Sequence, residues 1–293
     1  MNPAAAEALF LPADGGQRYC LYQPAGGRCR GALLYVAPFA EEMHKSRRMA
    51  ALLAHALAQR GIATLRFDLD GCGDSSGDFA DARWGAWHAD VARALRWLEQ
   101  RTGQRAGLLG LRLGALLAAD YLAAEPPGSA ARQLILWQPV LDGATFLTQF
   151  LRLRAAGAML GAKDGNANST AALRTRLAAG EALEIGGYEL APALASAIDA
   201  LKLAPLLRPQ DTVSWLDVGA PGRTLAPASA MVLDALRARG VQVALTPVDG
   251  TAFWASQEIA TCPALLAATV ALAPGLAAAP PAAITVNECA YAI

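Results

Sequence analysis

The residues best placed to do chemistry lie where a predicted strand runs directly into a predicted helix, in the segment LLGLRLGALL at 108–117. Gly110, Arg112 and Gly114 have the spacing of G-x-S-x-G, a strained turn that lifts its central side chain above a sheet. Arg112 stands in place of the serine. A guanidinium is no nucleophile and, with a pKa above about 12, it is a poor base, but it binds anions.

Two hypotheses for Arg112 follow from its place at the start of a helix. In the first, Arg112 and the backbone N–H groups of Phe39, Ala40 and Leu113 hold the carboxylate, phosphate or sulfate group of a small molecule. A helix N-terminus already favours negative charge, and arginine adds a fork of donors. In the second, Arg112 pairs with a nearby carboxylate and fills a disused pocket. The residues alone leave both hypotheses open.

A carboxylate pair, Glu41 and Glu42, follows the first predicted parallel strand. Beside a ligand site, such a pair could do general acid–base or metal chemistry. The structural alternative is that both carboxylates interact with the dipole of the helix that follows and with Arg47 and Arg48. They are also the expected partners of Arg112 if it fills a disused pocket.

The loop after the second predicted strand holds the other candidate nucleophiles, Cys72 and Ser75, within the segment DLDGCGDSSG at 68–77. Because this loop lies at the ligand-binding edge of an open α/β sheet, Arg112 could lower the pKa of the Cys72 thiol. The alternative is that the small residues only shape a tight loop, with Asp74 and Ser75 capping its backbone.

The chain lacks two members of the triad that such a turn normally serves. The expected order is Ser, then an acid after a late strand, then His after the last strand. The histidines are His44, His55 and His88, and all precede Arg112. Asp217 could occupy the acid position, but the segment DGTAFW at 249–254 has no histidine. Ordinary Ser-His-Asp catalysis is therefore expected to be absent.

Aromatic residues near the predicted strand ends are candidates for the wall of a pocket. Trp137, Phe253 and Trp254 either line it or pack an inserted segment against the sheet. His88 lies on or beside the apolar stripe of the predicted helix at 84–98, so we expect it to be structural.

The elements that must position these residues alternate between apolar runs of β type and amphipathic helices, which predicts a parallel sheet with crossover helices. The expected parallel strands are 32–36, 62–68, 106–111, 133–137, 212–218 and 241–248. A hairpin through Asp14, Gly15 and Gly16 predicts an antiparallel edge. Together with the two loops and the turn at Arg112, this order predicts the α/β-hydrolase fold: a mostly parallel central sheet with flanking helices.

A long excursion at 142–208 interrupts this rhythm, and we expect it to be an inserted helical lid over the carboxyl ends of the strands. The predicted organisation is therefore one core in two parts, 1–141 and 209–293, with the lid between them.

Several motifs resemble one family, the second type of exosortase A system-associated hydrolases. The motifs are PFAEEMHKSRRM at 38–49, LDGCGDSSGDFADARW at 69–84, GLRLGALLA at 110–118, and the later WQPVLDG, GYELAPAL and FWASQE. The resemblance implies an α/β-hydrolase-superfamily protein of Gram-negative bacteria, tied to exosortase sorting of PEP-CTERM proteins and to exopolysaccharide production. It implies a hydrolase of the ester or thioester class. His44 stands where the family has Asn, which argues against a catalytic His44.

The amino-acid composition excludes several classes of binding partner. The 25 basic and 25 acidic residues cancel, which argues against nucleic-acid binding, and 54% hydrophobic residues exclude a disordered chain. With no signal-like N-terminus and no long uninterrupted apolar span, we expect a cytoplasmic protein without membrane insertion. Five cysteines without paired spacing predict no disulfide framework, no metal and no cofactor. The expected partner is a small, anionic substrate or ligand, with a protein partner as the alternative.

Overall fold

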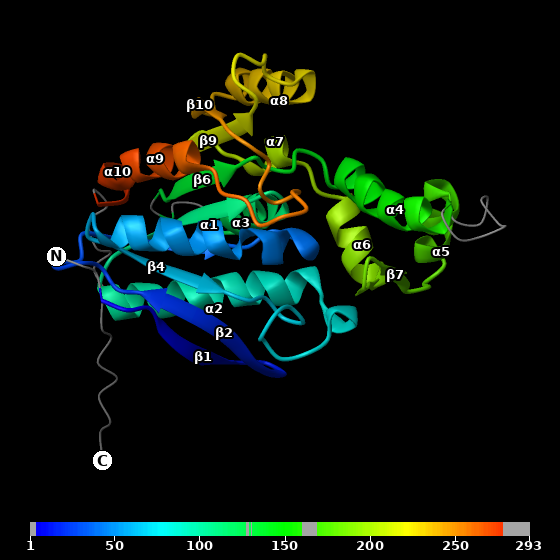
Figure 1. The fold of residues 1–293 in the computed structure, drawn as a ribbon, viewed down its shortest axis with the longest axis horizontal. Coiled ribbons are helices and arrows are strands. Elements are labelled where there is room, and N and C mark those ends of the chain that lie inside the picture. Colours follow the sequence, from blue (N-terminus) through cyan, green and yellow to red (C-terminus); the bar gives the residue numbers. More distant parts are fainter. Residues whose placement is uncertain (1–3, 127–128, 130, 160–168, 278–293) are drawn as a thin grey trace.

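An eight-stranded sheet organises the chain in the computed structural model, which describes residues 4–126, 129, 131–159 and 169–277 (Figure 1). The strand order is β1-β2-β4-β3-β5-β6-β9-β10. The bounds are β1 Glu7–Ala13, β2 Gly16–Gln23, β3 Gly31–Val36, β4 Ile62–Phe67, β5 Ala106–Leu111, β6 Gln133–Trp137, β9 Thr212–Gly219 and β10 Val243–Asp249. β1 and β2 form the antiparallel edge, and the pairs from β4 to β10 are parallel. The predicted α/β-hydrolase sheet is confirmed.

The central strands are continuous apolar runs because helices cover both of their faces. Every residue of β3 (GALLYV) and of β5 (AGLLGL) is buried. The edge strand β10 is mostly exposed and contains Pro247, which cannot donate a ladder hydrogen bond. Burial thus decreases from the middle of the sheet to its edge, and the loops after β3 and β5 leave from its most buried strands.

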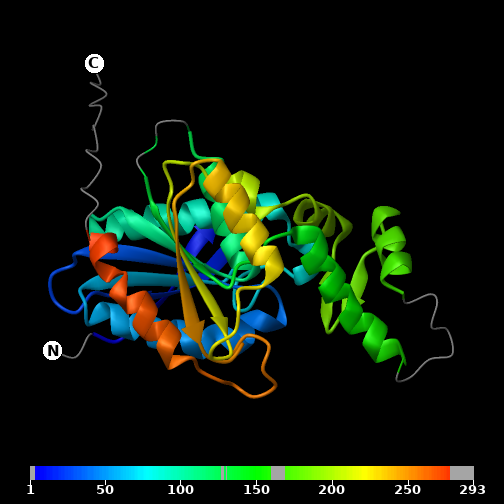
Figure 2. The same ribbon diagram turned by 90° about the horizontal axis from the view of Figure 1, so that it is seen from above.

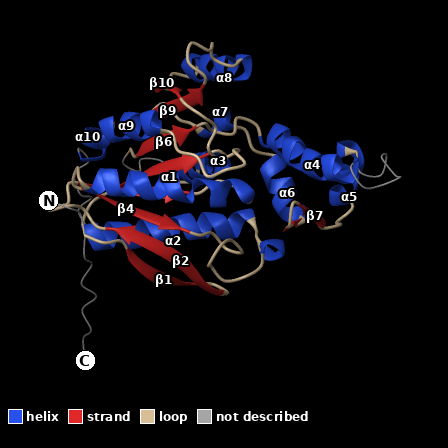
Figure 3. Ribbon diagram, in the orientation of Figure 1, coloured by secondary structure: helices blue, strands red, loops and turns tan. Residues whose placement is uncertain are grey.

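Helices enclose the sheet from two sides (Figures 2 and 3). Apolar residues of α1 (Glu41–Ala58), α9 (Pro263–Ala271) and α10 (Ala273–Ala277) pack on one face, with Leu33 and Leu109 of the sheet. Those of α2 (Trp84–Thr102), α3 (Leu113–Ala123) and α8 (Pro227–Ala238) pack on the other, with Leu34 and Leu108. Alternate residues of one strand thus serve opposite faces. No helix among the described residues is long and apolar enough to cross a membrane.

The excursion at 142–208 contains the elements α4 Gly143–Met159, α5 Thr170–Ala178, β7 Leu183–Ile185, β8 Tyr188–Leu190, α6 Pro192–Asp199 and α7 Leu203–Leu206. Of these, the helices α4, α5 and α6 and the strand β7 project beyond one end of the sheet, whereas α7 lies beside the sheet (Figure 1). Residues 160–168 of this excursion, like 278–293 of the last core segment, lie outside the described residues. Ser169 caps α5 by accepting a hydrogen bond from the Ala172 N–H at 3.2 Å, and Pro192 opens α6.

Aromatic rings attach the excursion to the sheet. The ring of Phe39, in the loop after β3, lies 5.6 Å from that of Phe146 and 5.0 Å from that of Phe150, both on α4. Tyr188 of β8 packs on Phe79 of the short helix η1 (Phe79–Asp81), with ring centroids 5.1 Å apart. These T-shaped contacts hold α4 beside the loop after β3, where the candidate site lies.

Candidate functional site

The turn between β5 and α3, here called the elbow (residues 110–114), has the strained geometry that its glycine spacing predicts. Arg112 has φ 55° and ψ −118°, a conformation that side-chain-bearing residues rarely adopt. A Cβ on Gly114 would lie 2.3 Å from the carbonyl oxygen of Ala37, and one on Gly110 would lie 2.4 Å from Ala115. Gly114 is therefore required for the close packing of α3 against the loop after β3, and Gly110 for the close approach of β5 to the first turn of α3.

Arg112 contacts a carboxylate and an aromatic ring. Its Nε donates to Oε1 of Glu42 at 3.2 Å, and its guanidinium carbon lies 5.9 Å from the centre of the Trp254 ring. The second contact has cation–π geometry. Glu41 does not share in this pair, because it is exposed and lies 3.7 Å from Lys45 one helical turn away. Of the two predicted carboxylate partners, the structure selects Glu42.

Glu42 is in an unusual environment for a carboxylate. Burial raises its pKa above the ordinary value, an effect that Arg112 opposes. Its Oε2 is buried and has no hydrogen-bond partner among the described residues. Removing a carboxylate from water favours its neutral form, so Glu42 takes up a proton more readily than an exposed glutamate does.

A cavity of about 190 Å³ opens beside this pair. It lies between the loop after β3, the elbow and α4. Its lining residues are Phe39, Ala40, Glu41, Glu42, Arg112, Phe146, Gln149, Phe150 and Leu153. One charged pair therefore faces a mainly apolar and aromatic wall, the composition typical of a small-molecule site.

Two backbone donors stand beside Arg112 in the fold. Ala40 is the N-cap of α1, with φ 49° and ψ −128°, and Leu113 is the first residue of α3. None of the described residues accepts a hydrogen bond from the N–H of either one. These are the two positions at which α/β hydrolases form an oxyanion hole. The first turns of two helices thus leave donors available for an anion.

The late acid, Asp217, has a cationic partner that is not a histidine. It is buried at the end of β9 and pairs with Arg223, which also donates to the carbonyl oxygen of Val218 at 3.0 Å. The histidines lie elsewhere: His44 is exposed on α1, His55 lies 3.1 Å from Gln59, and His88 lies 2.7 Å from Asp120.

Cys72 and Ser75 are held by the loop after β4. The Ser75 hydroxyl donates to the carbonyl oxygen of Asp68 at 2.6 Å and accepts from the N–H of Tyr19 at 3.0 Å. Burial, helped by Asp68 and Asp70, raises the pKa of the Cys72 thiol to about 12. A thiol with that pKa is neutral near pH 7, so this geometry favours the loop-shaping alternative over a nucleophile.

The two predicted tryptophans have different surroundings. Trp137 is fully buried, and its indole N–H donates to Thr269 of α9 at 2.9 Å, so it lies outside the cavity and packs a helix on the sheet. Trp254, in the loop after β10, is nearly buried and reaches Arg112. Phe253 packs between them, with its ring centre 6.2 Å from Trp137 and 5.0 Å from Trp254.

Sequence reasoning missed the wall supplied by α4. Phe146, Gln149, Phe150 and Leu153 line the cavity at spacings of three, one and three residues, which is one face of a helix. That periodicity was readable in the sequence, but it could not show which surface the helix face meets. Sequence reasoning also missed Arg223, the partner of Asp217. No group of three His, Cys, Asp or Glu among the described residues could hold a metal ion.

Comparison with known proteins agrees with this fold. A family model described as "Serine aminopeptidase, S33" matches residues 34–174. The carboxyl ends of β3 and β5 and the whole of α4 lie within that range. No protein of curated function matches the sequence.

Three solved structures share the fold across nearly their whole length. Est1E from Butyrivibrio proteoclasticus, with ferulic acid bound, is 17% identical with a TM-score of 0.64 and covers 93% of this chain and 100% of its own. A thermostable carboxyl esterase from Bacillus coagulans is 11% identical with a TM-score of 0.62, covering 94% and 99%. An alpha-beta serine hydrolase homologue from Coxiella burnetii is 17% identical with a TM-score of 0.53, covering 92% and 96%.

The strand order, the elbow and the similarity to these solved structures define the class by its fold: the chain has the α/β-hydrolase fold. Within the class, it has arginine at the apex of the elbow and a Trp-containing loop after the last strand.

Proposed function

We propose that this chain binds the anionic group of a small molecule at Arg112 and does so without Ser-His-Asp catalysis. The observation that carries the proposal is the position of Arg112: its guanidinium stands at the apex of a strained elbow, beside two backbone N–H groups that have no acceptor among the described residues and beside a cavity of about 190 Å³. Backbone strain at such a position is usually retained for a functional reason. The fork of an arginine matches a carboxylate with two parallel hydrogen bonds.

Glu42 competes with an incoming anion for the positive charge of Arg112. With Glu42 ionised, the two side chains neutralise each other through one hydrogen bond of 3.2 Å. With Glu42 protonated, Arg112 keeps a full positive charge and the carboxyl group itself becomes a donor. The raised pKa of Glu42 supports this exchange. Anion binding is therefore coupled to uptake of a proton by Glu42.

A hydrolase of the ester or thioester class is the second candidate function. The half-buried Glu42 would act as the general base toward a water molecule, and the N–H groups of Ala40 and Leu113 would hold the developing oxyanion. The Est1E structure with ferulic acid shows a carboxylic acid bound to a protein of this fold. A base at Glu42 is favoured over a nucleophile at Cys72, whose thiol has a raised pKa, and over one at Ser75, whose hydroxyl is engaged by Asp68 and Tyr19.

The sequence resemblance supplies a biological setting for the proposal. Similarity to exosortase A system-associated hydrolases connects the ligand with exopolysaccharide production and with the sorting of PEP-CTERM proteins. Residues 142–208 would then serve as the lid of the site, since α4 already forms one of its walls. A protein partner in the same pathway is the alternative ligand.

Isothermal titration with ferulate, acetate and sulfate tests the binding proposal. Wild-type protein is expected to bind at least one of these anions, and Arg112→Ala is expected to weaken binding by about tenfold or more. Arg112→Lys keeps the charge but loses the fork, so it should lie between the two. Arg48→Gln, on the exposed side of α1, is the matched control. Equal affinity in wild type and Arg112→Ala would overturn the proposal.

Turnover of p-nitrophenyl acetate separates the two candidate functions. The binding proposal expects no turnover above the buffer rate, together with no labelling by a fluorophosphonate probe. The hydrolase candidate expects turnover that Glu42→Gln abolishes. Turnover that survives Glu42→Gln and disappears in Ser75→Ala would contradict both.

A further inference from the structure

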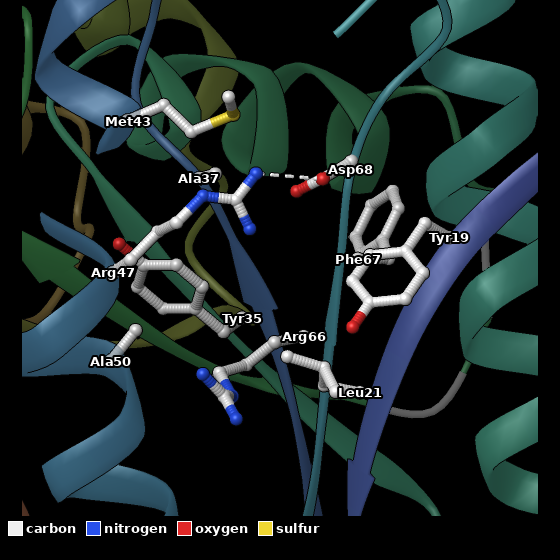
Figure 4. A pocket seen from close by; sticks show the side chains of 10 residues that line it. All are labelled: Tyr19, Leu21, Tyr35, Ala37, Met43, Arg47, Ala50, Arg66, Phe67 and Asp68. Carbon is white, nitrogen blue, oxygen red and sulfur yellow. Dashed lines mark hydrogen bonds and ion pairs between the residues drawn. The ribbon is translucent and has the colours of Figure 1, made fainter. Parts of the chain in front are cut away.

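A second cavity, of about 30 Å³, lies on the face of the sheet that α1 covers (Figure 4). Its wall comes from α1 and from strands β2, β3 and β4. It shares no lining residue with the cavity at Arg112. Its lining residues are Tyr19, Leu21, Tyr35, Ala37, Met43, Arg47, Ala50, Arg66, Phe67 and Asp68.

Two polar groups of this cavity lack partners. Tyr35 is 4% exposed, and its hydroxyl is buried without a hydrogen bond to any described residue. The Nε of Arg66 is likewise buried and unpartnered among the residues that the structure describes. Leaving a buried donor unsatisfied costs about 1–3 kcal/mol, so native proteins rarely do it. Two such donors on one small cavity indicate a missing acceptor.

The charges of the cavity do not cancel. Arg47 donates to Asp68 at 2.8 Å, and Figure 4 shows this pair across the top of the cavity. Arg66 forms no ion pair with a described residue, and burial lowers its pKa, an effect that the nearby Arg47 increases. The Tyr35 and Tyr19 hydroxyls and the Asp68 carboxylate favour its charged form but leave one net positive charge. The missing acceptor is therefore an anion.

The volume of the cavity and the residues at its entrance limit which anions can bind there. A water molecule needs about 10–15 Å³ measured in this way, so 30 Å³ holds a carboxylate group but not a whole metabolite. Tyr19 and Leu21 at the cavity are only half-buried and offer apolar surface. We infer that this cavity binds the carboxylate of a small organic acid through Arg66 and Tyr35, with the apolar part of the acid against Tyr19 and Leu21.

Titration with benzoate in the Arg112→Ala background tests the inference, because that background removes binding at the elbow. Benzoate is expected to bind, and Arg66→Gln to weaken binding by about tenfold or more. Should Arg66→Gln fail to fold, Arg66→Lys replaces it, since lysine keeps the charge but not the fork. Arg48→Gln is again the control. No binding, or equal binding with and without Arg66, would overturn the inference.

Two further measurements distinguish a ligand site from a structural cluster. Tyr35→Phe should weaken benzoate binding by about threefold to tenfold without lowering the melting temperature of the free protein, because the hydroxyl has no partner to lose. A lower melting temperature with unchanged affinity would contradict the inference. Inorganic phosphate should compete poorly with benzoate, whereas phosphate that binds as tightly would overturn the assignment to a carboxylate.

Discussion

The elbow after β5 and the loop after β4 (residues 68–78, the β4 loop) lie at the same edge of the sheet. They differ in whether their polar groups have hydrogen-bond partners. In the β4 loop the groups satisfy one another: Asp68 accepts from Arg47 and from the N–H of Asp74, and Ser75 both donates and accepts. Beneath it, Arg18 is 3% exposed and pairs with Asp70 at 2.6 Å and Asp90 at 2.8 Å.

At the elbow the groups stay partly unsatisfied. Arg112 and Ala40 have positive φ angles, the N–H groups of Ala40 and Leu113 lack acceptors among the described residues, and one oxygen of Glu42 is buried without a partner. A satisfied loop contributes stability, whereas strain and open donors reduce it. Residue type alone therefore does not mark a site: Cys72 and Ser75 are of nucleophilic type but lie in the satisfied loop, whereas Arg112 is no nucleophile and stands beside the open donors.

The largest expected effect comes from the ion network under the β4 loop. Arg18→Met should destabilise the protein by about 3–5 kcal/mol, because it leaves Asp90 buried without its closest cation. Urea unfolding measures the change. The double variant Arg18→Met, Asp90→Asn should recover part of the loss, since no uncompensated charge remains. A decrease of less than about 1 kcal/mol in the free energy of unfolding would contradict the stabilising role assigned to the β4 loop.

The elbow should resist a single added methyl group. Gly114→Ala is expected to cost about 1–3 kcal/mol, because the new Cβ meets the carbonyl oxygens of Ala37 and Val36 at 2.3 and 2.4 Å. Gly85→Ala, near the start of α2, is the control: nothing lies within 4 Å of its added Cβ, so it should be neutral or stabilise by up to about 1 kcal/mol. Equal effects of the two variants in thermal unfolding would contradict the packing argument.

Substitution of Ser75 tests whether its hydroxyl is structural or reactive. Ser75→Ala should lower the free energy of unfolding by about 1–2 kcal/mol, because the N–H of Tyr19 loses its acceptor. Sulfate binding at the elbow should not change, which titration of the folded variant measures. Unchanged stability together with weaker sulfate binding would assign ligand binding to the β4 loop and contradict its structural role.

The smallest effect concerns Glu42 and pH. Since burial raises the pKa of Glu42, protonation begins at a higher pH than for an exposed glutamate, and it releases Arg112. Sulfate keeps its charge over this range, so its affinity should rise about threefold to tenfold from about pH 8 to about pH 5. Glu42→Gln should bind tightly at both pH values. A pH dependence that persists in Glu42→Gln would assign the titration to another group.

Much of the fold could be predicted because it depends on local sequence. Residues 106–111 are uniformly apolar, a pattern typical of a strand that is covered on both faces. The strand predicted from it has the same bounds as β5. The strand predicted at 241–248 differs from β10, which begins at Val243 and ends at Asp249. Its bounds are harder to predict because an edge strand has a weaker apolar pattern. For Trp137 the sequence leaves both the pocket wall and packing open, and the indole side chain packs under α9, because strand alternation alone does not say which face a cavity adjoins.

The sequence by itself determined the strand-turn-helix elbow with its two glycines, the arginine at its apex and the absence of histidine after β10. These follow from residue identity and from sterics between near neighbours. Only the tertiary structure decided that Glu42 and not Glu41 meets Arg112, that α4 walls the cavity, and that Ser75 is satisfied by Tyr19. Such contacts join residues far apart in the chain, and competition for partners is settled only when the whole core is packed.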